Sequence, residues 1–195
     1  GEQLSFSFRT TKEIVAANVL NRAFDTNYTG GDGKALCVTD HPSLAGNWSN
    51  TLATAADLSE ASLETMLVNI SLAKNSRGLP IAIRGKKLIV SPSDAFNAER
   101  ILKSALQNDT ANNAVNAIRS MGLLPGGYMV NHYLTDTDAW FVKTDAPDGL
   151  LGFQRQAFEF TQDNDFDTEN AKAKGYERYS FGWTDPRGLY GSPGA

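Results

Sequence analysis

The sequence contains very little cysteine: Cys37 is its one thiol. A single cysteine excludes an intramolecular disulfide, so the fold depends on a buried apolar core, and a reducing cytoplasm is the expected place of synthesis. The chain opens at Gly1 without the charged and then apolar pattern of a secretory leader. It also has no apolar run near the roughly 20 residues that a membrane-spanning helix needs. We therefore expect neither a disulfide-stapled domain nor a membrane partner.

A surplus of positive charge is also missing. The 195 residues include 18 Lys and Arg against 22 Asp and Glu, which gives a net charge of −4. This balance argues against a protein that binds nucleic acid through one dominant basic face. The hydrophobic share of 41% and the charged share of 21% are those of an ordinary globular protein. A chain of this length buries enough surface to fold without staples.

Motifs that carry chemistry are scarce. We find no nucleophile elbow, zinc-ligand cluster or dinucleotide fingerprint, and residues 30–34 lack the residues that define a phosphate loop. Cys37 with His41 or His132 is the one candidate nucleophile and base, but apolar residues flank Cys37 and favour a buried structural thiol. We predict no catalytic and no cofactor-binding residue.

Alternating carboxylates resemble the start of a calcium loop at Asp163, Asp165 and Asp167. Thr168 stands where that loop requires glycine, and Lys174 stands where it requires a bidentate glutamate. A solvated acidic loop is the favoured interpretation, and we predict no metal site.

Helical periodicity dominates the first half of the chain. Apolar residues at spacings of three and four predict a helix over 10–25 and a second helix that follows Asp57 and Glu60, a pair that resembles a capping box. Ser91 and Pro92 predict the N-cap and first turn of a third helix that ends near Asn108. The residues expected on the buried faces are Ile14, Ala17, Leu20 and Phe24, then Leu63, Met66, Leu67, Ile70 and Ala73, then Ala95, Ala98, Leu102 and Ala105.

Strand patterns dominate the second half. We expect strands over 81–84, 88–90, 128–134, 139–142, 151–160 and 172–183, with a turn at 85–87. The last strand alternates so that Tyr179, Phe181 and Trp183 share one face. Helices followed by antiparallel-looking strands predict the α+β class.

Segments spread over nearly the whole chain resemble the major capsid protein of tailed bacteriophages and prophages, the family with the Hong-Kong-97-type capsid fold. Their order and spacing carry the resemblance. The segments are 11–13, 18–24, 30–36, 40–42, 48–50, 57–63, 87–90, 98–102, 133–136, 139–141 and 176–183.

The resemblance implies a two-domain arrangement. Residues 1–87 would form the first part of a peripheral domain, with a spine helix and a second helix. Residues 88–165 would form an axial domain, with a central sheet and flanking helices. Residues 166–195 would return to the peripheral domain as long antiparallel strands. We expect the chain to lack the N-terminal arm and the extended loop that precede the spine helix in the family.

The resemblance also implies a structural function without catalysis. Pentamers and hexamers of the chain would build an icosahedral shell around double-stranded DNA, in a virion made in the cytoplasm of a bacterial host. Portal, scaffold and decoration proteins are possible partners, and the DNA would be held without sequence-specific contacts. The alternatives are a gene-transfer particle or nanocompartment with the same fold, a thiol hydrolase that uses Cys37, and a calcium-dependent binding module. Trp183, Arg187 and Tyr190 are candidate intersubunit contacts on residue type alone.

Overall fold

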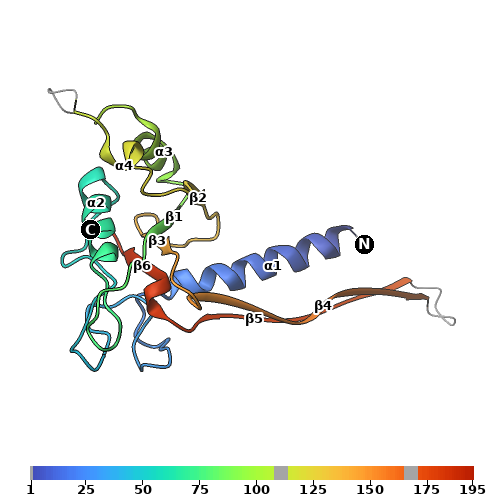
Figure 1. The fold of residues 1–195 in the computed structure, drawn as a ribbon. Coiled ribbons are helices and arrows are strands. Elements are labelled where there is room, and N and C mark those ends of the chain that lie inside the picture. Colours follow the sequence, from blue (N-terminus) through green and yellow to red (C-terminus); the bar gives the residue numbers. More distant parts are fainter. Residues whose placement is uncertain (1, 108–113, 165–170) are drawn as a thin grey trace.

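A computed structural model describes residues 2–107, 114–164 and 171–195, and it confirms the α+β class (Figure 1). Helices and strands form a body from which one long arm projects. In chain order the elements are α1 (Glu2–Asn21), α2 (Glu60–Ser71), β1 (Gly85–Val90), α3 (Ala95–Lys103), α4 (Ala117–Ser120), β2 (Tyr128–Val130), β3 (Trp140–Thr144), β4 (Leu150–Asn164), β5 (Ala171–Trp183), the 3-10 helix η1 (Pro186–Gly188) and β6 (Leu189–Ser192).

The body is built around a sheet with strand order β2-β1-β3-β6. Side chains alternate along a strand, so Leu88 and Val90 pack with α2 and α3, while Ile89 packs on the opposite face with Leu20 and Cys37. Burial of each such side chain contributes about 1.5–3 kcal/mol. The sheet is therefore covered on both faces, by α2 and α3 on one side and by the end of α1 with its following loop on the other.

One pairing in this sheet differs from expectation. We expected antiparallel strands, but β1 and β2 run parallel, with Leu88 opposite Tyr128 and Val90 opposite Val130. Parallel neighbours require a crossover, and α3 and α4 lie between β1 and β2 in the chain. The other pairs, β1 with β3 and β3 with β6, are antiparallel.

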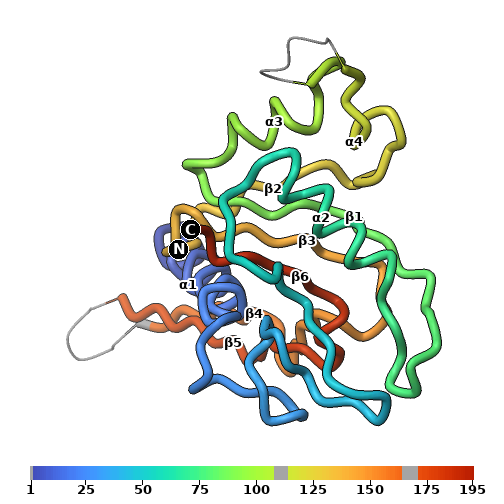
Figure 2. Tube along the Cα trace, turned by 90° about the vertical axis from the view of Figure 1, so that its left-hand side faces the viewer, coloured from blue at the N-terminus to red at the C-terminus, as the bar shows by residue number. Residues whose placement is uncertain are grey.

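The arm consists of the β4–β5 hairpin and α1, which lie side by side in Figures 1 and 2. Phe8 of α1 packs on Phe158 with ring centroids 5.0 Å apart, above Gly175. A Cβ on Gly175 would lie 2.6 Å from Phe8, so this close approach of helix and strand requires glycine. Lys12 Nζ pairs with Glu177 Oε1 at 2.5 Å and fixes the helix along the hairpin.

Two predicted helices have different ends in the structure. The first helix begins at Glu2 instead of residue 10, because Leu4 and Phe8 add partly buried contacts that continue its inner face. The second helix is capped by Ser59 with Ser62, not by Asp57 with Glu60: Ser59 Oγ accepts from Ser62 N at 3.1 Å. Its predicted buried face, from Leu63 to Ala73, is confirmed.

The third helix also starts later than predicted, at Ala95, with Asp94 as its N-cap residue. The predicted cap, Ser91, donates its hydroxyl to Thr137 O at 2.7 Å and so ties the end of β1 to the loop before β3. Of the predicted buried face, Ala98 is buried and Ala105 is exposed, and Ile101 is buried although it was not predicted. The predicted end near Asn108 lies outside the described residues, and the helix itself ends at Lys103.

Several strand predictions need correction. Residues 81–84 are not a strand, because Arg84 N donates to the side chain of Asp145 (2.8 Å); the predicted turn at 85–87 is instead the start of β1. Strand β2 ends at Val130, where Asn131 Oδ1 accepts from Tyr133 N and closes a turn. Strands β4 and β5 are confirmed with longer bounds, β3 is confirmed but starts at Trp140 and ends at Thr144, and β6 was not predicted. The domain boundaries stay a prediction, and the one at 165 lies outside the described residues.

Candidate assembly surface

The side chains of Cys37 and His41, the candidate nucleophile and base, are both buried. Cys37 packs in the core beside Leu36 and Ile89, and burial raises the pKa of its thiol far above the usual range. His41 Nδ1 lies 2.6 Å from Asp32 Oδ2, and Nε2 lies 3.2 Å from Asn50 Oδ1. Both imidazole nitrogens are thus engaged by oxygen atoms. A thiolate nucleophile activated by His41 has no support in this geometry.

Asn50 is the centre of this buried polar network. Its Nδ2 donates to the carbonyl oxygens of Leu36 at 2.7 Å, Leu189 at 3.0 Å and Pro186 at 3.2 Å. Its Oδ1 accepts from Val38 N at 2.9 Å and faces His41. One side chain therefore joins the loop that follows α1 to strand β6, more than a hundred residues away. Sequence reasoning missed this residue, because a single asparagine in a loop has no distinguishing local pattern.

Asp32 completes the network. Its partial burial opposes ionisation, but hydrogen bonds from His41 and from Lys34 N outweigh that effect and hold the pKa of Asp32 below its ordinary value. Lys34 pairs in turn with Asp40. The polar side chains of the loop over 30–34 are therefore engaged in contacts within the chain.

The other candidate catalytic and metal-binding residues do not form a site among the described residues. His132 is exposed in the loop that follows β2, on a different segment from Cys37. Asp163 lies near the end of β4, and Asp165 and Asp167 lie outside the described residues. Within residues 2–107, 114–164 and 171–195, no group of three or more His, Cys, Asp or Glu side chains is arranged to hold a metal ion.

The three candidate intersubunit contacts occupy different environments. Tyr190 is buried in the core, and this burial, with Asp185 adding to it and Arg187 opposing it, raises its pKa to about 12. Arg187 stacks over Trp48 at 4.4 Å and donates from Nε to Lys74 O at 2.9 Å. Trp183 is half-buried against Gly30. Contacts within the chain thus occupy Tyr190 and Arg187, and the role of all three between subunits stays a prediction.

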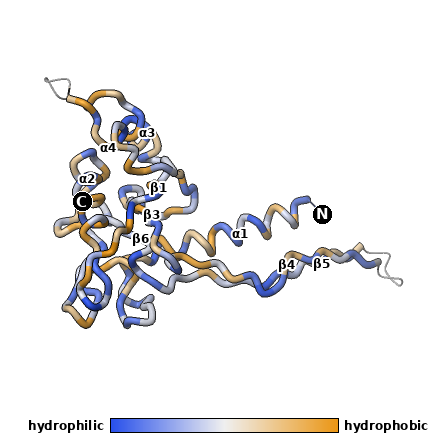
Figure 3. Tube along the Cα trace, viewed as in Figure 1, coloured by the Kyte–Doolittle hydropathy of each residue, from blue (hydrophilic) through white to orange (hydrophobic). Residues whose placement is uncertain are grey.

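The arm carries apolar side chains that the described residues leave partly exposed. Phe153 of β4 is 63% exposed and Phe6 of α1 is 62% exposed, and Phe160 and Tyr176 are also exposed. Figure 3 shows hydrophobic segments recurring along the hairpin well away from the core. Large apolar side chains exposed on a projecting element are typical of a site of protein contact.

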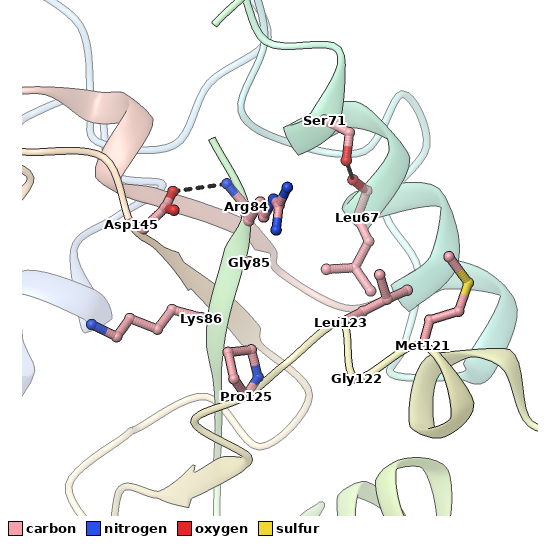
Figure 4. Close-up of a pocket in the computed structure, with 10 residues that line it drawn as sticks. All are labelled: Leu67, Ser71, Arg84, Gly85, Lys86, Met121, Gly122, Leu123, Pro125 and Asp145. Carbon is pink, nitrogen blue, oxygen red and sulfur yellow. Dashed lines mark hydrogen bonds between the residues drawn. The ribbon is translucent and has the colours of Figure 1, made fainter. Parts of the chain in front are cut away.

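A second surface feature is a groove of about 470 Å³ between α2, the start of β1 and residues 121–125. Leu67, Met121 and Leu123 form its apolar wall, and the side chain of Arg84 extends beside them (Figure 4). Gly85 allows β1 to approach α2 here, since a Cβ at this position would lie 2.7 Å from Leu67 Cδ2. The groove thus combines an apolar wall with a cationic rim.

Comparisons with known proteins found a matching family model and similar solved structures. The model of a family described as phage capsid protein matches residues 1–192. A virus-like particle from Pyrococcus furiosus is similar at 12% identity and a TM-score of 0.44, over 73% of this chain and 55% of that chain. A structure from Mycobacterium phage Che8 is similar at 18% identity and a TM-score of 0.45, over 72% of this chain and 52% of that chain.

The chain therefore spans about half the length of these two solved structures. No curated protein matches the sequence. In the part of the chain that the structure describes, no helix has the length and apolar character needed to cross a membrane.

Proposed function

Since this chain belongs to the phage capsid protein family, we propose that it is the repeating subunit of a closed icosahedral shell around double-stranded DNA. Family membership makes it a structural shell protein of the virion, as the sequence resemblance indicated. The finer statements are part of the proposal: assembly through pentamers and hexamers, a Hong-Kong-97-type subunit, synthesis in a bacterial cytoplasm, and interaction with portal, scaffold or decoration proteins.

The projecting arm is the observation that carries this proposal. Its hairpin has strands of 15 and 13 residues, and a two-stranded hairpin is at best marginally stable in water. Helix α1 packs against it through Phe8 and Lys12, yet Phe153, Phe160 and Tyr176 remain exposed. Neighbouring subunits would supply the missing cover.

The energetics suit a lattice. Burial of one exposed phenylalanine contributes about 1.5–3 kcal/mol, which is too little for a stable pair of subunits after the cost of association. Every copy presents the same side chains, so in a closed shell these weak contacts are repeated with symmetry and sum to a stable structure.

The charge of the chain fits an enclosed DNA that must move in and out. A net charge of −4 does not attract phosphates, so packaged DNA would contact the shell weakly and without sequence preference. The burial of the Cys37 thiol argues against the thiol hydrolase that the sequence left open.

The test is sedimentation velocity with negative-stain electron microscopy on the purified product of the complete gene, across a range of concentrations. We expect closed shells or rings of five or six subunits. DNA protected from nuclease inside particles made in cells would separate a DNA-filled head from a nanocompartment. A folded monomer at every concentration would contradict the proposal.

A matched variant strengthens this test. Phe153→Ser with Phe160→Ser removes exposed apolar area from the arm, and its far-ultraviolet circular dichroism shows whether the subunit still folds. We expect folded monomers in place of shells. Leu44→Ser, at an 87% exposed position in a loop of the body, is the control that should assemble normally.

A further inference from the structure

We propose that neighbouring copies of this chain join head to tail, with Phe96 and the aspartates around it on one copy seated in the Arg84 groove of the next. The inference rests on the proposed shell function and adds the contact that would close a ring of subunits. Its occupant is a second copy of this chain, and the argument comes from surface chemistry and from the placement of the two surfaces.

The first surface is an acidic knob, formed by Phe96 with Asp57, Asp94, Asp136 and Asp138. Phe96 is 77% exposed at the start of α3, although its side chain is among the most hydrophobic. Asp94 lies two residues before Phe96: burial raises the pKa of Asp94, a hydrogen bond with Asn97 opposes the rise, and the negative charges of Asp138 and Asp57 add to it. An exposed aromatic ring among charges is a typical anchor of a protein contact.

The knob is held in shape by bonds between distant segments. Ser91 Oγ donates to Thr137 O at 2.7 Å, and Asn97 Nδ2 donates to Leu58 O at 2.8 Å. Asp136 Oδ1 accepts from Asp138 N at 3.1 Å. Within the described residues, none of the four aspartates of the knob forms an ion pair. Their charges are therefore available to a partner, and the surface is preorganised.

The second surface is the groove already described, with Leu67, Met121 and Leu123 as its wall and with Arg84 and Lys86 as its cations. Neither cation forms an ion pair in the part of the chain that the structure describes. Its volume of about 470 Å³ lies in the range of pockets that hold small molecules, so a phenyl ring has room. Met121 is 69% exposed at its edge and can pack on such a ring.

The two surfaces carry opposite net charge. Four carboxylates of the knob face two cations of the groove in the proposed contact. Each surface also carries one charge of the other sign: Arg100 lies one turn from Phe96 on α3, and Asp145 lies in the groove. Such complementarity fixes the register of a contact and disfavours wrong partners.

The two surfaces lie at opposite ends of the central sheet. The knob is at the end where β1 finishes and β3 begins, and the groove is where β1 begins and β3 finishes. Six residues of β1 separate them by about 20 Å, and Figure 2 shows β1 and β3 crossing the body between the two sides. A contact between two different patches is heterologous, and it produces a closed ring when the rotation between copies closes.

Disulfide trapping tests the contact directly. In Ser93→Cys with Met121→Cys, Phe96 is retained, both new thiols are exposed, and the native Cys37 stays buried. Under mild oxidation we expect a ladder of covalent oligomers on a non-reducing gel, up to five or six copies. The control pair Ser93→Cys with Leu44→Cys places the second thiol at an exposed site away from the groove and should give no ladder.

Charge reversal provides a second test of the contact. Arg84→Glu or Asp138→Lys alone should raise the protein concentration needed for assembly about tenfold or more, and the double variant should restore it. Arg77→Glu, an equal charge change at an exposed position outside the groove, should have no effect.

The outcomes separate the two proposals. Shells without a ladder, and with full assembly of the reversed variants, would overturn the head-to-tail contact and leave the shell function standing. Rings with a ladder but no closed particles would support the contact and contradict the shell. Monomers alone would overturn both.

Discussion

Removal of the Asn50 side chain should destabilise the subunit more than any other change of a single polar residue in the loop after α1. Asn50→Ala leaves three fully buried groups without this partner: Leu36 O, Leu189 O and His41 Nε2. An unsatisfied buried group costs about 1–3 kcal/mol, so we expect a loss of about 3–5 kcal/mol after local relaxation. A domain of this size has about 5–15 kcal/mol in total.

Asn50→Asp examines the orientation of the amide. The substitution keeps Oδ1 for Val38 N and His41, but it places a second oxygen against the carbonyl oxygens that now accept from Nδ2. We therefore expect a loss at least as large as that of Asn50→Ala, although the side chain keeps its size. Equal stability of Asn50→Asp and the native protein would show that the amide does not face those carbonyls.

The assay is urea unfolding followed by tryptophan fluorescence, with free energies from linear extrapolation. Asn69→Ala is the matched control, since Asn69 lies on α2 and makes no side-chain hydrogen bond among the described residues. The control should change stability by less than about 0.5 kcal/mol. A loss below about 1 kcal/mol for Asn50→Ala would refute the assignment of Asn50 as the link between the loop and β6.

Three further predictions concern the ion pair in the arm, the dependence of stability on acidic pH, and the thiol of Cys37. Lys12→Met leaves the Glu177 carboxylate, whose side chain is 5% exposed, without its ion partner; we expect a cost of about 2 kcal/mol, seen as faster hydrogen exchange in β5 and unchanged exchange in β1. Because the folded pKa of Asp32 is lowered, its contribution to stability is fully present above the unfolded pKa of about 3.9 and is lost as pH falls through the folded pKa. Asp32→Asn should therefore flatten the dependence of the unfolding midpoint on pH below about pH 4, and an unchanged slope would contradict the assigned cause. Cys37 should react with a thiol reagent at neutral pH only as fast as the protein unfolds, and rapid labelling of the folded protein would overturn its burial.

Local patterns were a good guide wherever the buried face of an element follows its own periodicity. The face of α2 from Leu63 to Ile70 and the alternation of Tyr179, Phe181 and Trp183 in β5 are both confirmed. Helix starts were less well predicted, because hydroxyl and carboxyl side chains compete for the cap. Ser59 took that position at α2 instead of Asp57, and Ser91 was diverted to Thr137 O.

Strand β6 is an element that local patterns did not predict. Its four residues include Gly191 and are all buried, so the segment has neither the length nor the alternation that predicts a strand. Strand β6 pairs with β3, and Asn50 is hydrogen-bonded to it. These contacts place Tyr190 in the core. Residue type alone had suggested Tyr190 as a surface anchor.

The sequence by itself determined the class of the fold and the resemblance to a capsid family, because these depend on composition and on spacings of a few residues. The tertiary structure decided the parallel pairing of β1 with β2 and the hydrogen bonds from Asn50 to Leu36 and Leu189. It also placed Phe96 and Arg84 at opposite ends of one sheet. Each of these joins residues that are far apart in the chain. Buried polar groups must find partners wherever the packed fold brings them, and no local period encodes that requirement.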